Sequence, residues 1–350
     1  MKRLWHVLGW LVGAISLGIF LVYFFDWETT KDLFLNIKVS FVCLGASVFC
    51  LTILLRVAKW VYIINISEHV SLRDGYHTIM ISNMVNFLLP VRAGEFLKLY
   101  LINKSSGISY QTSITATLWD RSTHIILMMV FLLLMPVADF KFSQWTSNYV
   151  LVFIFSVIFV VLVFVFGTRC LNILEAVVGS FSELMSIERR KVDILLQSRV
   201  ASFFRETLDR INISSFKKGD LLLIGLVTCI IICLDGVCYY FVIRAFEIHI
   251  TWLQGILAAC LMCLAFILPT PPGLIGTAEM YPIIIFSWGL GLPESVVSSA
   301  AILWHLLTIA FVILLGICSL LAMGLTFGSL FKNRKIHTVG NSERGKDTDS

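Results

Sequence analysis

The sequence predicts an all-α integral membrane protein, with about six full spans and two re-entrant or broken helical hairpins of opposite orientation. Of its 350 residues, 58% are hydrophobic and only 14% are charged, whereas soluble domains are about half apolar and about a quarter charged. Six apolar runs are long enough to cross a hydrocarbon core of about 30 Å. Two further apolar regions are interrupted by proline, glycine and charged residues, which predicts broken helices.

The six uninterrupted runs are the predicted spans. The first follows Lys2 and Arg3 and has no clear small-residue cleavage site, so we expect it to be retained and not removed as a signal peptide. The others are separated by polar or charged connections. In chain order the runs are Leu4–Phe25, Val39–Ile64, Ile114–Pro136, Tyr149–Phe166, Leu221–Val242 and Ser295–Leu325.

The two interrupted regions are the predicted hairpins. Thr78–Ile102 is broken by "LPVRAGE", and Trp252–Trp288 is broken by "LPTPPGLIG". Each either crosses the membrane twice or enters and leaves on one side. We favour re-entrant hairpins, the first from the cytoplasm and the second from outside. Paired broken segments point to the midplane site of an inverted-repeat transporter, although proline and glycine are also common in ordinary membrane helices.

Basic residues in short loops set the predicted orientation, because they favour the cytoplasmic side. The acidic "DWETTKD" after the first span is expected outside, so Arg56 and Lys59 fall toward the cytoplasmic end of the second span. Residues 170–219 form a predicted cytoplasmic loop with an amphipathic helix. Both termini are then cytoplasmic, and the expected location is the bacterial cytoplasmic (inner) membrane. We expect one polytopic domain over residues 1–330 and a disordered tail over 331–350.

The stretch "NFLLPVRAGEFLK" carries the strongest polar signal. Pro90 cannot continue a helix, and Gly94 allows another backbone or a ligand to approach closely. If a helix restarts after the proline, Arg92, Glu95 and Lys98 form a charged stripe on one face. An arginine fork suits phosphate oxygens, so a headgroup-phosphate subsite is one interpretation. A salt bridge that merely holds the hairpin together is the other.

Two further stretches contribute candidate residues. In "LWDRSTH", Asp120, Arg121 and His124 lie near the start of the third span, as either an interfacial ion pair or a functional group. In the second hairpin, Glu279 is an intramembrane carboxylate, which is by default a functional-site hypothesis. It could carry a proton or pair with Arg92. The residues that break this hairpin are Pro269, Pro272, Gly273 and Gly276.

No pattern of nucleophile, base or metal ligands is convincing, so we expect no catalytic residue, cofactor or metal. Cys260-x-x-Cys263 lacks a second pair. Asp235 and His305 lie singly within spans and are expected to make packing hydrogen bonds. An integral membrane enzyme acting on lipid-linked phosphate remains an alternative to a transporter, as does a non-transporting lipid-binding scaffold.

At these motifs the chain resembles the lysylphosphatidylglycerol synthase transmembrane family, also described as a flippase-like domain. The resemblance covers about residues 5 to 328. The first family signature, roughly N-x-x-x-P-x-R-x-G-E with a basic residue after it, is matched by Asn86, Pro90, Arg92, Gly94, Glu95 and Lys98. The third, P-x-x-P-G-x-x-G-x-x-E, is matched by Pro269, Pro272, Gly273, Gly276 and Glu279.

The second signature is an acidic-arginine pair followed by an aspartate one turn later. Asp120 and Arg121 match the pair, and His124 stands where the family prefers the acid. In the multiple peptide resistance factors a domain of this kind moves an aminoacylated phospholipid between leaflets, while a cytosolic domain makes that lipid. Because the sequence ends soon after the last predicted span, we expect a stand-alone member without the aminoacyl-transferase domain.

The resemblance therefore implies translocation of a phospholipid, polyprenyl-phosphate-linked or related lipid headgroup. Arg92 and Lys98 would hold phosphate, Glu95 would orient Arg92 or take a headgroup amine, and Glu279 would supply the matching group on the second hairpin. Relatives without the enzyme domain are associated with varied lipids, including hopanoids and polyprenol-linked sugars. The expected partners are membrane lipids. A separate lipid-modifying enzyme or glycosyltransferase and a second copy of the chain are further candidate partners. No nucleic-acid partner is expected.

Overall fold

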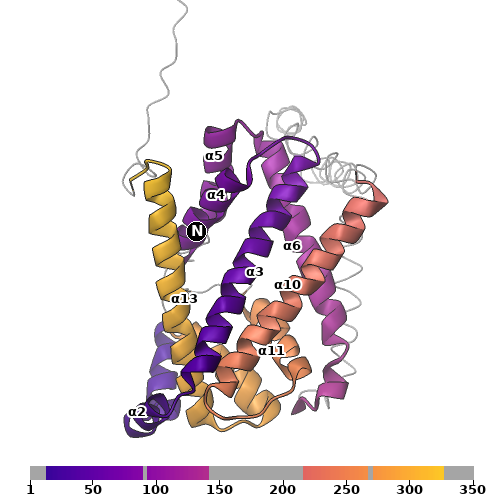
Figure 1. The fold of residues 1–350 in the computed structure, drawn as a ribbon. Helices are drawn as coiled ribbons and strands as arrows, with labels where there is room; N and C mark the ends of the chain where they lie inside the picture. The colour runs from indigo at the N-terminus through magenta and orange to yellow at the C-terminus, as the bar shows by residue number, and fades with distance from the viewer. Residues whose placement is uncertain (1–12, 90–92, 142–215, 267–270, 327–350) are drawn as a thin grey trace, which may run out of the picture.

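A computed structural model describes residues 13–89, 93–141, 216–266 and 271–326. Throughout these residues the regular structure is helical (Figure 1), which confirms the predicted all-α class. Several predictions fall elsewhere in the chain. The predicted span Tyr149–Phe166, nearly all of the loop 170–219 and the tail 331–350 lie outside the described residues.

Three long apolar helices form the frame of the bundle and match three predicted spans. They are α3 (Val39–Asn65), α10 (Lys218–Arg244) and α13 (Glu294–Ala322), and each is long and apolar enough to cross a membrane. α6 (Tyr110–Leu132) runs beside α10 (Figure 1). The described part of the first predicted span is a shorter apolar helix, Gly13–Phe24, which ends in the π-helical turn η1 (Phe20–Phe24).

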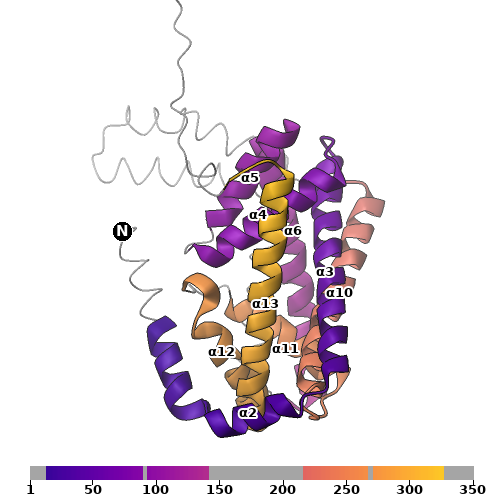
Figure 2. The same ribbon diagram turned by 60° about the vertical axis from the view of Figure 1, so that its left-hand side comes forward.

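The acidic segment after this first helix forms a short helix of its own, α2 (Trp27–Leu35). Asp26 caps it, because its carboxylate accepts hydrogen bonds from the Glu28 backbone N–H and from the Thr29 hydroxyl. The Thr29 hydroxyl, held 2.5 Å away, lowers the pKa of Asp26. α2 lies across the lower end of the bundle in Figure 2, so the chain turns there before it enters α3.

Each interrupted region forms a helical hairpin, and the two are oriented oppositely, as predicted. Hairpin 1 consists of α4 (Leu72–Leu88) and α5 (Ala93–Ser106) and enters from the upper end of the bundle. Hairpin 2 enters from the lower end, and both tips point toward the middle, beside α13 (Figure 2). The helical segments of hairpin 2 are α11 (Trp252–Ala265), η6 (Pro272–Leu274), α12 (Thr277–Pro282) and the π-helical η7 (Ile283–Trp288).

The breaks follow from local backbone preferences. α4 ends at Leu89, whose extended backbone (φ −113°, ψ 143°) is the conformation favoured before a proline. In hairpin 2 the chain takes left-handed values at Gly273 (φ 67°) and Gly276 (φ 83°), which glycine adopts without steric cost. Leu274 between them is also left-handed (φ 56°), which costs a non-glycine residue roughly 1–2 kcal/mol. The tip is therefore a tight, defined turn that neighbouring contacts must hold in place.

Hairpin 2 is fastened to the frame by a close helix crossing. Gly236 of α10 packs against Ile256 of α11, and a Cβ atom at position 236 would lie 2.4 Å from the Ile256 Cα atom. Such a distance is far inside van der Waals contact, so any larger residue would force the two helices apart. Gly225 lies on the same helix, and a Cβ atom added there would meet no other atom within 4 Å.

These two glycines give a matched test of the packing. We expect Gly236→Ala to lower the melting temperature of the detergent-solubilised protein, because overpacking costs about 1–3 kcal/mol. Gly225→Ala should leave the melting temperature unchanged or raise it slightly, because alanine is the better helix former by about 1 kcal/mol. Thermal unfolding followed by intrinsic fluorescence is the measurement. Equal melting temperatures in the two variants would contradict the close crossing.

Candidate functional site

A cavity of about 280 Å³ opens inside the bundle beside hairpin 1. Its walls come from α3, α4, α5, α6, α10 and α13, so it lies where the described spans and hairpin 1 converge. Apolar and charged side chains share the lining, and this is unusual for a membrane interior, where charge is expensive. The charged lining residues are Arg56, Glu95, Lys98, Asp120, Arg121 and Asp235.

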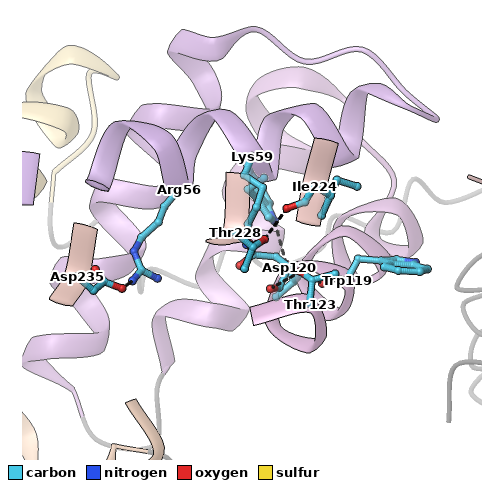
Figure 3. Close-up of polar contacts among 10 residues, drawn as sticks. Arg56, Lys59, Trp119, Asp120, Thr123, Ile224, Thr228 and Asp235 are labelled. Carbon is cyan, nitrogen blue, oxygen red and sulfur yellow. Dashed lines mark hydrogen bonds and ion pairs between the residues drawn. The ribbon is translucent and has the colours of Figure 1, made fainter. Parts of the chain in front are cut away.

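Two cations on α3 reach carboxylates on neighbouring helices (Figure 3). Arg56 donates to Asp235 of α10 at 2.5 Å. One turn further along α3, the Lys59 ammonium lies 2.8 Å from a carboxylate oxygen of Asp120 on α6 and donates to the Thr228 hydroxyl on α10 at 3.2 Å. The Lys59 side chain is only 3% exposed, so this ion pair is withdrawn from solvent and joins three helices.

Hairpin 1 brings a second set of charges to the same cavity. One carboxylate oxygen of Glu95 forms an ion pair with the Lys98 ammonium at 2.9 Å, and the other accepts a hydrogen bond from Arg121 of α6 at 2.8 Å. Lys98 is buried, and its ammonium lies 5.1 Å from the centre of the Trp60 ring, close enough for a cation–π contact. Arg121 is half exposed, so its guanidinium has donors to spare for another group.

The balance of charge around the cavity favours an anion. Arg56 and Lys59 each have a carboxylate of their own, whereas Lys98 and Arg121 share Glu95. The charged lining residues are three cations and three carboxylates, but Asp120 is neutralised by Lys59, which does not itself line the cavity. Among the described residues in and beside the lining, four cations therefore accompany three carboxylates, and the surplus positive charge lies at the Glu95 end. Asn86 is nearby, with its amide 3.5 Å from Glu95, and its Oδ1 atom is buried with no hydrogen-bond partner among the described residues.

The structure places some of the predicted site residues together, places Glu279 apart from them, and does not describe the rest. Asn86, Glu95, Lys98, Asp120 and Arg121 are brought together by hairpin 1 and α6 at or beside the cavity. Glu279 is not among the residues that line it; its carboxylate contacts His305 of α13 at 2.6 Å and the Gly276 backbone N–H at 2.8 Å. Pro90, Arg92 and Pro269 lie outside the described residues.

Gly94 allows a close approach of backbone to backbone. It lies in the first turn of α5, after the break, and a Cβ atom there would be 2.0 Å from the Ser82 carbonyl oxygen of α4. The Ser82 hydroxyl in turn donates to the Gly94 carbonyl at 2.8 Å. The glycine therefore lets the two arms of hairpin 1 pack together, which places Glu95 and Lys98 over the cavity.

Sequence reasoning did not assign Arg56 and Lys59 to the site. It placed them near the cytoplasmic end of the second span as orientation signals, whereas both point into the bundle (Figure 3). A signal was available, because two basic residues three apart within a 27-residue apolar helix share one face and need partners. Asp235, expected to make a packing hydrogen bond, is the ion-pair partner of Arg56.

His124, Asp235 and Cys263 form one further cluster beside the cavity. They come from α6, α10 and α11, and their potential ligand atoms lie within 4.8 Å of one another. These are donor types that transition metals accept. Here the Asp235 carboxylate already neutralises the Arg56 guanidinium, so a metal ion at this place would have to compete with a fixed cation.

Fold and site together define a multi-pass helical membrane protein with two broken helical hairpins of opposite orientation and a charged cavity. The family model described as the lysylphosphatidylglycerol synthase TM region matches residues 7–316. The chain belongs to this family, as its motifs predicted. No curated protein and no solved structure matches the chain significantly.

The Lys59–Asp120 pair gives a test of charge burial. We expect Asp120→Asn to destabilise the protein by about 3–5 kcal/mol, because it leaves a buried ammonium without its counter-charge. Replacing both partners (Lys59→Met with Asp120→Leu) should recover most of that loss. Thermal unfolding in detergent is the measurement.

The exposed Lys38–Glu247 pair, at 2.9 Å, is the matched control. Glu247→Gln should change stability by no more than about 1 kcal/mol, because water screens an exposed ion pair. A loss as small for Asp120→Asn as for Glu247→Gln would mean that Lys59 is hydrated in the folded protein.

Proposed function

We propose that this protein translocates lipids, binding a phosphate-containing headgroup in the charged cavity while the acyl chains remain in the bilayer. The observation that carries the proposal is the surplus of positive charge at Glu95, Lys98 and Arg121 inside a membrane-embedded cavity. The family assignment supports a lipid-related function and leaves the cargo open. We place the protein in the bacterial cytoplasmic membrane, with both termini on the cytoplasmic side.

The size of the cavity supports a headgroup and not a whole lipid. Pockets for drug-sized ligands measure about 300–1,000 Å³, so about 280 Å³ suits a phosphate with a small substituent. Acyl chains would have no room beside it. A headgroup in the cavity with its chains outside is the arrangement that moving a lipid between leaflets requires.

The pairing pattern supports exchange of partners on binding. A phosphate that approaches Lys98 and Arg121 competes with Glu95, the one carboxylate that these cations share. Arg121 can offer a second face of its guanidinium without leaving Glu95, since arginine has five donors. The free Asn86 amide oxygen could accept a hydrogen bond from a headgroup hydroxyl or ammonium. The site therefore suits anionic and zwitterionic headgroups.

Reconstitution into phosphatidylglycerol vesicles tests the proposal. The probe is phosphatidylglycerol with a short NBD-labelled acyl chain, and dithionite reports its arrival in the outer leaflet. We expect the protein to accelerate this transfer. Lys98→Gln and Arg121→Gln should each slow it about ten- to hundredfold, because each loses a charge-assisted hydrogen bond worth about 1.5–3 kcal/mol. Lys38→Gln, in an exposed ion pair, should have no effect.

A second probe tests the size limit. Phosphatidylethanolamine with NBD on its headgroup should not be transferred, because the fluorophore exceeds the cavity. Equal transfer of both probes would show that lipids pass by another route. Mass spectrometry of the recovered lipids tests the enzyme alternative, which requires altered lipid. If neither probe is transferred and every lipid is unaltered, the proposed translocation is wrong and a binding scaffold becomes the better interpretation.

A further inference from the structure

A second cluster of ionisable groups lies apart from the cavity, where hairpin 2 meets α13. The Glu279 carboxylate contacts His305 Nδ1 at 2.6 Å through one oxygen and accepts from the Gly276 N–H at 2.8 Å through the other. The second ring nitrogen of His305, Nε2, lies 2.7 Å from the Gly273 carbonyl oxygen. The side chains of His305 and Glu279 are only 8% and 11% exposed, so the cluster is enclosed.

These contacts fix the number of protons in the cluster. A carbonyl oxygen can only accept, so Nε2 of His305 must carry a hydrogen and donate it to Gly273. A carboxylate and a bare Nδ1 lone pair would repel each other at 2.6 Å, so one hydrogen must lie between them. Either an imidazolium donates to a carboxylate, or a carboxylic acid donates to a neutral imidazole. Both forms hold the same single shared proton and have no net charge.

Among the described residues, no neighbouring side chain offers a substitute for that proton. Hairpin 1 contributes the uncharged Phe87, whose ring centre is 6.1 Å from that of His305. The Gly13–Phe24 helix contributes backbone atoms of Gly13 and Leu17 beside Gly276. In the part of the chain that the structure describes, Glu279 is the charged side chain that acts on His305. On hairpin 2 itself, the Tyr281 ring packs against Phe266, the residue that follows α11.

Loss of the proton would therefore leave in an enclosed site a negative charge that no described side chain compensates, which is strongly unfavourable. It would also remove the hydrogen bond between Glu279 and His305. Hairpin 2 would then keep the Gly273 contact to His305 but lose its stronger attachment to α13. The strained turn at Gly273 and Leu274 depends on neighbouring contacts of this kind.

We propose that Glu279 and His305 form a proton-binding site, whose shared proton fastens hairpin 2 to α13, and that release of this proton to water frees the hairpin during transport. The proposal rests on the proposed lipid translocation and adds a coupling ion to it. Transporters built on paired broken helices place coupling ions where such helices meet. Here Phe87 in the last turn of α4, the Gly273 turn of hairpin 2 and α13 meet at His305.

Hydrogen exchange of the protein in nanodiscs tests the proton site without any transport. Protection of the amides over residues 273–282, corrected for intrinsic exchange, should be high at acidic pH and fall as pH rises. Linkage limits the fall to about tenfold per pH unit above the titration point for one proton. Glu279→Gln should keep the protection at every pH, because its amide can donate to Nδ1 and its carbonyl can accept from Gly276.

Glu294→Gln is the matched control. Glu294 also joins hairpin 2 to α13, through a 3.4 Å hydrogen bond from Trp288, but on the exposed surface. This variant should show the pH dependence of the wild type. His305→Gln removes the other partner of the shared proton and should also abolish the pH dependence. This variant keeps the test valid if Glu279→Gln does not fold. Protection that does not change with pH in the wild type would overturn the proposal.

Vesicle transfer of the acyl-labelled phosphatidylglycerol then tests coupling. An imposed pH gradient should change the wild-type rate severalfold and leave the rates of Glu279→Gln and His305→Gln unchanged. If the wild-type transfer rate is the same with and without the pH gradient, the coupling is wrong, while the proposed function stands. Absence of any transfer, together with pH-dependent protection, would overturn the proposed function and leave the proton site in place.

Discussion

Charge inside a low-dielectric bundle must be paired, and the pairing of charges organises this protein. Lys59 of α3 is held by Asp120 of α6, Arg56 by Asp235 of α10, and Arg121 of α6 by Glu95 of hairpin 1. Buried ion pairs contribute little net stability, because desolvation offsets their attraction. Breaking one is costly, however, so the pairs fix which helix faces lie together. The relative positions of α3, α6, α10 and hairpin 1 follow from this requirement.

The same requirement separates two chemistries along the axis of the bundle. Around the cavity the charges are several, partly exposed and unequal in number, so an incoming anion can exchange partners with Glu95. At the tip of hairpin 2 the polar groups are enclosed, and a single proton balances them. The cavity is therefore suited to a charged ligand, and the Glu279–His305 cluster is suited to a proton. The two regions are linked mechanically, since hairpin 1 contributes to both: Lys98 lines the cavity and Phe87 packs beside His305.

Much of the fold could be predicted from one-dimensional features, and the site only in part. Long apolar runs specify α3, α10 and α13, and the proline and glycine residues at the breaks specify both hairpins. Glu95, Lys98, Asp120 and Arg121 were predicted because charge stands out in an apolar context, and Asn86 was predicted from the family signature. Arg56 and its partner Asp235 were not joined, because 179 residues separate them and no local spacing connects the two. The Glu279–His305 contact was not predicted, for the same reason. Single polar residues in different spans reveal their role only when packing brings them together.

The order of the chain has a consequence for how the protein is made. Hairpin 2 leaves the ribosome before α13, yet the Gly273 carbonyl and Glu279 carboxylate at its tip are satisfied by His305, which follows 32 and 26 residues later. Until α13 enters the bilayer, these groups need water or another temporary partner. Hairpin 2 is thus expected to remain near the membrane surface during synthesis and to dock only when α13 has been inserted. Docking of hairpin 2 would then depend on the insertion of α13, because His305 satisfies the polar groups at its tip.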